Sequence, residues 1–140
     1  MYSVNVLLVD DETPFVETMT KRLSKRNLSV TAAYSGEEAL KELTQNNDIE
    51  VVILDVKMPG MDGIQTLKEI KRQHPFIEVI MLTGHANVEV AIEGMELGAF
   101  DYLMKPINID ELLYKLHDAH KEKLIREKRI NEMRPKEGMQ

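Results

Sequence analysis

The sequence contains no cysteine and no tryptophan, and aromatic residues make up only 5% of its 140 residues. Without cysteine the chain has no disulfide, no thiolate metal site and no cysteine nucleophile. Its longest unbroken apolar runs are four residues, far below the roughly 18 that a membrane-spanning helix needs. The first nine residues lack a basic start and lead directly into two aspartates, which is not typical of a signal peptide. We therefore expect a cytoplasmic protein that does not contact the membrane.

Charge is distributed unevenly along the chain. The total net charge is −6, of which residues 1–120 contribute −9 and residues 121–140 contribute +3. An acidic body argues against direct nucleic-acid contact, which requires a basic face. The last segment mixes both signs, and this favours a solvated helix over a nucleic-acid contact. With 43% apolar residues and this length, we expect one domain over 1–120, followed by a charged helical extension or linker over 121–140.

Short apolar runs alternate with amphipathic helical patterns five times. The runs are Asn5–Val9, Ser29–Ala33, Val51–Leu54, Val79–Leu82 and Tyr102–Met104. Three of them are nearly continuous valine, isoleucine and leucine, which is typical of strands buried on both faces in a parallel sheet. Strict alternation predicts an α/β fold with helices on both faces of that sheet. Five units favour the flavodoxin-like (βα)5 doubly wound sheet, with strand order 2-1-3-4-5, over an eight-stranded barrel.

Capping residues mark several helix boundaries. The expected starts are Thr13 before Pro14, Ser35 with Glu38 three residues later, and Asn108 with Glu111. The last helix is expected to start at Ile109 and to continue to Met133, before Pro135. Leu116, Leu124 and Ile130 on this helix offer an imperfect seam through which a homodimer could form.

Polar side chains follow four of the five predicted strands. Asp10 and Asp11 follow the first, Asp55 the third, Thr83 the fourth and Lys105 the fifth. In an open α/β sheet, ligands bind outside the carboxyl ends of the strands, so these side chains should meet at one edge. Clustered carboxylates repel one another unless a cation lies between them, and hard oxygen ligands suit Mg²⁺. The lysine ammonium and the threonine hydroxyl suit phosphoryl oxygens.

Four motifs in order resemble the receiver domain of bacterial two-component response regulators. They are VDDE at 9–12, DVKMPGMDG at 55–63, TG at 83–84 and DYLMKP at 101–106. Each motif alone is weak, but all four in register over about residues 4–120 are specific. Residues 98–116 and the helical extension after them resemble, more loosely, the receivers of sigma-54-dependent, NtrC-like transcription activators.

The resemblance implies a role for each residue of the predicted edge. Asp55 would accept a phosphoryl group from a phosphohistidine on a sensor histidine kinase or a phosphotransfer protein. Mg²⁺ would be held by the side chains of Asp11 and Asp55, by the backbone carbonyl of Lys57, and through water by Asp10. A carboxylate nucleophile gives a labile acyl phosphate, which suits a signal that must decay.

The same resemblance implies a conformational switch. Lys105 would pair with the phosphoryl group, Thr83 would hydrogen-bond to it, and the bond before Pro106 would be cis. Tyr102 occupies the aromatic switch position and would rotate inward behind Thr83, which changes the face formed by the fourth helix, fifth strand and fifth helix. That face would control an output domain or target protein. Lys57 and His85 are expected to border the hydrolytic water and to slow loss of the phosphoryl group.

The same residues bear on other possible functions. An aspartate-nucleophile phosphatase needs a second aspartate two residues after the nucleophile, where this chain has Lys57. A flavin or nucleotide module needs a glycine-rich turn after the first strand, where this chain has Asp10 and Asp11. A pseudo-receiver that only binds partners, and a regulatory fragment of a DNA-binding activator in place of a stand-alone receiver, remain alternatives. In no case do we expect an enzyme beyond one that catalyses its own phosphorylation and dephosphorylation.

Overall fold

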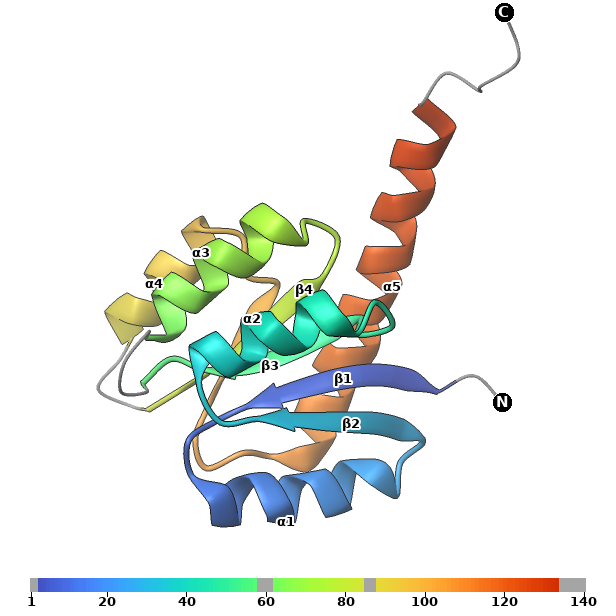
Figure 1. Ribbon diagram of the computed structural model, residues 1–140. Coiled ribbons are helices and arrows are strands. Elements are labelled where there is room, and N and C mark those ends of the chain that lie inside the picture. The colour runs from blue at the N-terminus through green and yellow to red at the C-terminus, as the bar shows by residue number, and fades with distance from the viewer. Residues whose placement is uncertain (1–2, 58–61, 85–87, 134–140) are drawn as a thin grey trace, which may run out of the picture.

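A computed structural model describes residues 3–57, 62–84 and 88–133. Five parallel strands form one sheet in the order β2-β1-β3-β4-β5, as the sequence predicts. The strands are β1 (Val4–Val9), β2 (Leu28–Ala33), β3 (Val51–Asp55), β4 (Glu78–Thr83) and β5 (Asp101–Met104). The helices are α1 (Thr13–Ser24), α2 (Gly36–Gln45), α3 (Gly63–Gln73), α4 (Val88–Glu96) and α5 (Ile109–Met133). Figure 1 shows this flavodoxin-like arrangement.

The helices cover both faces of the sheet (Figure 1). Helices α1 and α5 pack on one face through side chains such as Leu23 and Leu116, both 0% exposed. Helices α2, α3 and α4 cover the other face, where Leu43 and Leu67 lie in a second apolar cluster. The residues of β3 and β4 are buried throughout, which explains their continuous apolar sequences. Two cores therefore hold the sheet rigid and fix where the carboxyl ends of its strands lie.

Two of the three predicted helix starts are confirmed. The hydroxyl of Ser35 accepts a hydrogen bond from the Glu38 amide at 3.1 Å, and the Asn108 side chain accepts one from the Glu111 amide at 3.0 Å. The prediction that Thr13 caps α1 is wrong, because the helix already includes Thr13 and its N-cap is Glu12. Proline lacks only an amide hydrogen that the first turn leaves free, so Pro14 allows this earlier start.

Helix α5 extends as predicted from Ile109 to Met133 without a break at residue 120. Its carboxyl-terminal half leads away from the sheet (Figure 1). The prediction that Leu116 belongs to a dimer seam on this helix is wrong, because this side chain is 0% exposed and lies in the protein's own core. Leu124 and Ile130 are exposed. Among the described residues, no helix has the length and apolar character needed to cross a membrane.

Candidate functional site

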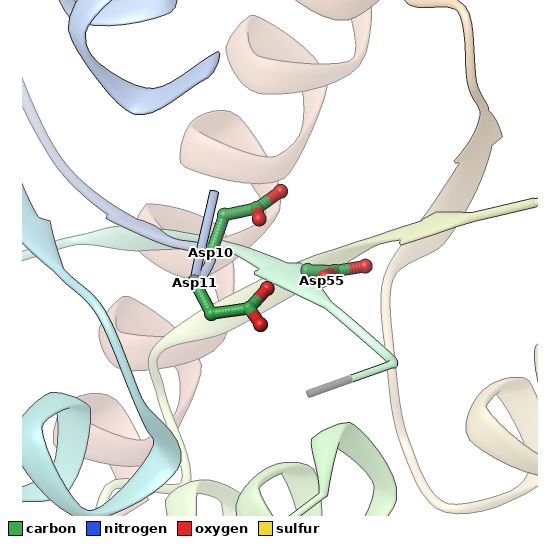
Figure 2. A group of neighbouring side chains, drawn as sticks. All are labelled: Asp10, Asp11 and Asp55. Atoms are coloured by element: carbon green, nitrogen blue, oxygen red, sulfur yellow. The ribbon is translucent and has the colours of Figure 1, made fainter. Parts of the chain in front are cut away.

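Three aspartates lie together at the carboxyl ends of β1 and β3. Figure 2 shows Asp10 and Asp11 directly after β1 and Asp55 at the end of β3, with their carboxylates directed toward the same space. One carboxylate oxygen from each residue lies within 4.8 Å of the others. Asp10 is 0% exposed and Asp55 is 5% exposed, whereas Asp11 faces solvent. The predicted convergence of these three residues is therefore found in the structure.

Lys105 reaches the same site from the end of β5. Its Nζ donates a hydrogen bond to Asp10 Oδ2 at 2.9 Å and lies 3.5 Å from Glu12 Oε1 and 3.8 Å from Asp55 Oδ1. Burial alone would lower the pKa of this ammonium. The hydrogen bond to Asp10 and the charges of Asp55, Asp10 and Glu12 outweigh burial and raise the pKa above its usual value. Lys105 is therefore a permanent positive charge beside Asp55.

The Asp55 carboxyl is electrostatically stressed. Its pKa is raised from 3.8 to about 6, chiefly by burial, then by the charge of Asp10 and to a smaller extent by that of Asp11. The charge of Lys105 and a hydrogen bond from the Lys57 amide, at 3.4 Å to Asp55 Oδ1, act in the opposite direction. Binding of a further cation beside Asp55 is favourable, because the cation offsets both the repulsion between the carboxylates and the cost of burying the Asp55 charge.

The donor set fits Mg²⁺. Mg²⁺ takes oxygen ligands at about 2.0–2.1 Å in octahedral geometry, so its ligands lie about 2.9 Å apart when adjacent and about 4.2 Å apart when opposite. The three aspartate oxygens lie within 4.8 Å of one another, which places them around a space of the size that such an ion occupies. The cluster that the described residues form consists of three carboxylates and includes neither cysteine nor histidine, which favours a hard metal ion over a soft one.

The backbones at the end of β3 and at the start of α3 approach each other closely. The Gly63 amide donates to the Val56 carbonyl at 3.3 Å, and a Cβ built on Gly63 would lie 2.3 Å from Val56 Cα and 2.8 Å from the Asp55 carbonyl oxygen. Only glycine allows α3 to begin this near to Asp55. The first turn of α3 is completed by Asp62, which accepts a hydrogen bond from the Gln65 amide in a capping box.

The two predicted switch residues, Thr83 and Tyr102, differ in their burial. Thr83 is 2% exposed, and its hydroxyl donates to the Leu103 carbonyl of β5 at 3.5 Å. Tyr102 is 39% exposed, so its ring lies at the surface of β5. The bond between Lys105 and Pro106 is cis, as the resemblance implied. His85, the expected partner of Lys57 near the site, lies outside the described residues.

Two contacts at the site escaped sequence reasoning. The Phe15 ring lies below the Lys105 ammonium, with Nζ 4.7 Å from the ring centroid. The role of Gly63 depends on the exact approach of α3 to β3. Gly63 ends the DVKMPGMDG motif, but the motif does not give its contact with Val56. Phe15 carries no local sequence signal, because it has the same spacing as an ordinary core residue of α1 and its partner lies 90 positions further along the chain.

Fold and site together define a flavodoxin-like, CheY-like α/β protein with a carboxylate and lysine cluster at the carboxyl edge of its sheet. The model for the response regulator receiver domain family matches residues 6–117, so the chain belongs to that family. This match confirms the predicted family and fold.

Individual relatives agree with the family match. The chain is 41% identical over 104 residues to the DNA-binding transcriptional regulator NtrC of Klebsiella pneumoniae, covering 74% of this chain and 22% of that protein. A crystal structure of a response regulator receiver domain protein from Clostridium thermocellum superposes with a TM-score of 0.84 and 37% identity, over 87% of this chain and 98% of that one.

A solved structure of a longer protein superposes on a larger share of this chain. The crystal structure of NtrX from Brucella abortus has a TM-score of 0.85 and 29% identity, over 95% of this chain and 30% of that one. The chain spans between 22% and 26% of the length of the curated relatives described in these comparisons. Those relatives therefore contain further sequence beside the part that resembles this chain.

Proposed function

We propose that this chain is the phosphoacceptor of a two-component system, in which Asp55 takes a phosphoryl group from the phosphohistidine of a sensor histidine kinase or phosphotransfer protein. The observation that carries the proposal is the placement of Asp55. It is a buried carboxylate with a raised pKa, grouped with two further aspartates and 3.8 Å from a lysine ammonium. Such a group combines a nucleophile, a cation site and a phosphoryl-oxygen ligand.

In the proposed reaction, one Asp55 carboxylate oxygen attacks phosphorus and the bond between phosphorus and the donor imidazole nitrogen breaks. The imidazole leaves with the electron pair of that bond. It is neutral because its other ring nitrogen keeps its proton. Mg²⁺, held by Asp11 and Asp55, with the Lys57 carbonyl and, through water, Asp10, would supply charge neutralisation for the phosphoryl oxygens. Lys105 is near enough to move from Asp10 to a phosphoryl oxygen on Asp55.

The switch is part of the same proposal. With the Thr83 hydroxyl hydrogen-bonded to the Leu103 carbonyl and Tyr102 exposed, the described arrangement is the one expected before phosphorylation. A phosphoryl oxygen on Asp55 is a stronger acceptor than a carbonyl, so the Thr83 hydroxyl would turn toward it. Tyr102 would then rotate inward, which changes the surface of α4, β5 and α5.

The output is proposed from the relatives. NtrC is named as a DNA-binding transcriptional regulator, and the NtrX match covers 95% of this chain. We therefore propose that the chain acts as the regulatory domain of a cytoplasmic, NtrC-like transcription activator, with DNA contact made outside this domain. A homodimer is a further proposal that follows from the exposed Leu124 and Ile130 of α5. Its own catalysis would be limited to phosphorylation and dephosphorylation of Asp55.

The test is the intact mass of the protein after incubation with acetyl phosphate and Mg²⁺. We expect a gain of one phosphoryl group that requires Mg²⁺ and is absent in Asp55→Asn. Asp48→Asn removes an exposed aspartate that precedes β3, at the opposite end of the strand from Asp55. It is the matched control and should be phosphorylated normally. If Asp55→Asn gains the same mass, Asp55 is not the acceptor. If wild type gains none from acetyl phosphate or from a phosphorylated histidine kinase, the pseudo-receiver alternative holds.

A further inference from the structure

The Lys105 ammonium lies beside three carboxylates and an aromatic ring. Its Nζ lies 2.9 Å from Asp10, 3.5 Å from Glu12 and 3.8 Å from Asp55, all of them carboxylates. On another side the Phe15 ring faces it, with 4.7 Å between Nζ and the ring centroid. A distance below about 6 Å is in the range of a cation–π interaction. Lys105 is therefore held by three negative charges and one aromatic face.

The Phe15 ring is itself fixed by the fold. It lies in the first turn of α1 and packs against the apolar cluster that joins α1 and α5 to the sheet. The ring also lines a cleft with Met19, Pro106 and Ile107, which brings α1 against the segment after β5. Because the ring packs against that apolar cluster, its place beside the ammonium is set by the fold.

The two kinds of contact respond differently to charge at the site. Attraction between Lys105 and the carboxylates weakens as those carboxylates are neutralised, whether by protons or by a bound cation. Attraction to the ring depends on the quadrupole of Phe15 and does not change with the charge of the aspartates. When the carboxylates are engaged elsewhere, the ring is the contact that still restricts the lysine.

We propose that Phe15 is a positioning residue, which keeps the Lys105 ammonium within reach of Asp55 while the carboxylates bind a cation. This inference rests on the proposed phosphoacceptor function. A free lysine side chain has several rotamers to lose before it can bind a phosphoryl oxygen, and the ring removes part of that cost beforehand.

Two variants separate the ring from simple packing. Phe15→Leu keeps an apolar side chain at this position but removes the π face, whereas Phe15→Tyr keeps the π face. Thr18→Ala is the matched control, because Thr18 is exposed, lies one turn further along α1 and lines the same cleft. Thermal unfolding of each variant identifies any general loss of stability.

The direct readout is the NMR signal of the Lys105 ε-methylene group, assigned with Lys105→Arg and recorded with and without Mg²⁺. An aromatic face shifts protons above it upfield. We expect that shift in wild type, Phe15→Tyr and Thr18→Ala under both conditions, and its loss in Phe15→Leu. A wild-type signal at the position of the other lysines would overturn the proposal.

The functional readout is the rate of phosphorylation by acetyl phosphate at saturating Mg²⁺. We expect Phe15→Leu to be roughly threefold to tenfold slower, consistent with the loss of a partly buried cation–π contact, with its Mg²⁺ affinity unchanged. Phe15→Tyr should retain most of the wild-type rate. Equal rates in wild type and Phe15→Leu would contradict the role of Phe15 alone. A wild-type chain that takes up no phosphoryl group would instead contradict the proposed function.

Discussion

At the scale of the residue, the site is built by placing a carboxylate where its charge is unfavourable. Asp55 is buried beside Asp10, and these two effects raise its pKa to about 6. Lys105 offsets part of the repulsion at 3.8 Å. The folded protein thus carries a local electrostatic strain that a bound cation or a phosphoryl group with its cation can relieve.

This strain predicts a pH-dependent effect of Asp55→Asn on stability in the absence of metal. The pKa of Asp55 is about 6 in the folded protein and 3.8 in the unfolded chain. Its contribution to stability is therefore fully present below pH 4 and is lost as the pH rises through 6. At pH 7.5 the neutral asparagine should make the protein more stable than wild type by roughly 1–3 kcal/mol.

Urea unfolding of both proteins in the presence of a chelator, at intervals from pH 4 to pH 8, measures the difference. It should grow from near zero at pH 4 and level off above pH 7. Asp48→Asn should show no such trend. A difference between Asp55→Asn and wild type that does not vary with pH would show that Asp55 titrates at its ordinary value.

At the scale of the element, two glycines allow helices of the same layer to approach the sheet. A Cβ on Gly63 would meet the backbone of Val56 at 2.3 Å, whereas one on Gly94 would meet the side chain of Met81 at 2.1 Å. Backbone cannot move without displacing β3, but a methionine side chain can adopt another rotamer. The two positions therefore differ in what a methyl group would disturb.

We expect Gly63→Ala to be the more damaging of the two alanine variants. It should destabilise the protein by about 3 kcal/mol and slow phosphorylation, because Asp55 must shift with Val56. Gly94→Ala should cost less than about 2 kcal/mol, since overpacking of Met81 is partly offset by the better helix propensity of alanine. Urea unfolding and the acetyl phosphate rate measure both effects. Similar losses of stability and rate in the two variants would contradict this distinction.

Helix α5 is anchored beyond the region that the family model covers. Buried Glu50 and Glu78 lie at the amino-terminal edge of β3 and β4, opposite the acidic cluster. Glu50 pairs with His120 at 2.6 Å, and Glu78 pairs with Arg126 at 2.6 Å. Both helix residues follow position 117, where the family match ends. The first turns of the extension are therefore part of the packed structure and do not form a free linker.

Removal of the Arg126 charge should loosen this anchor. Arg126→Met keeps much of the apolar stem but leaves Glu78 with Lys71, at 3.3 Å, as its remaining cationic partner among the described residues. We expect a loss of about 1–2 kcal/mol in stability and faster hydrogen exchange of the amides after residue 120. Lys128→Met, on the exposed side of the same helix, is the control and should change neither quantity. Unchanged exchange in Arg126→Met would show that the pair does not hold the extension.

The sequence predicted those features that depend on local or periodic patterns. The five strands, the strand order and the bounds of α5 are confirmed because burial on both faces and helical periodicity leave a regular trace. The carboxyl ends of parallel strands meet at one edge of a sheet. This rule predicts that Asp10, Asp11, Asp55 and Lys105 lie close together. The contacts of Phe15 with Lys105 and of Arg126 with Glu78 could not be predicted. Their partners are 90 and 48 positions apart, and only the packed fold sets their distance.

At the scale of the whole molecule, cation binding at one edge of the sheet should stabilise the entire fold. A ligand that binds only the folded state adds RT ln(1 + [L]/Kd), or about 1.4 kcal/mol at ten times Kd. The acidic cluster needs all three aspartates in place, and the unfolded chain cannot hold them together. Mg²⁺ at ten times its Kd should therefore raise the free energy of unfolding, measured with urea at pH 7.5, by this amount.

The effect should fall below pH 6, because Asp55 then takes up a proton that the cation must displace. Asp11→Asn removes an exposed carboxylate of the cluster and should abolish most of the Mg²⁺ effect with little loss of stability in metal-free solution. Asp48→Asn should keep the full effect. Equal stabilisation of wild type and Asp11→Asn would mean that Mg²⁺ acts elsewhere on the acidic surface, because only binding at the cluster makes the stability of the whole chain depend on this one side chain.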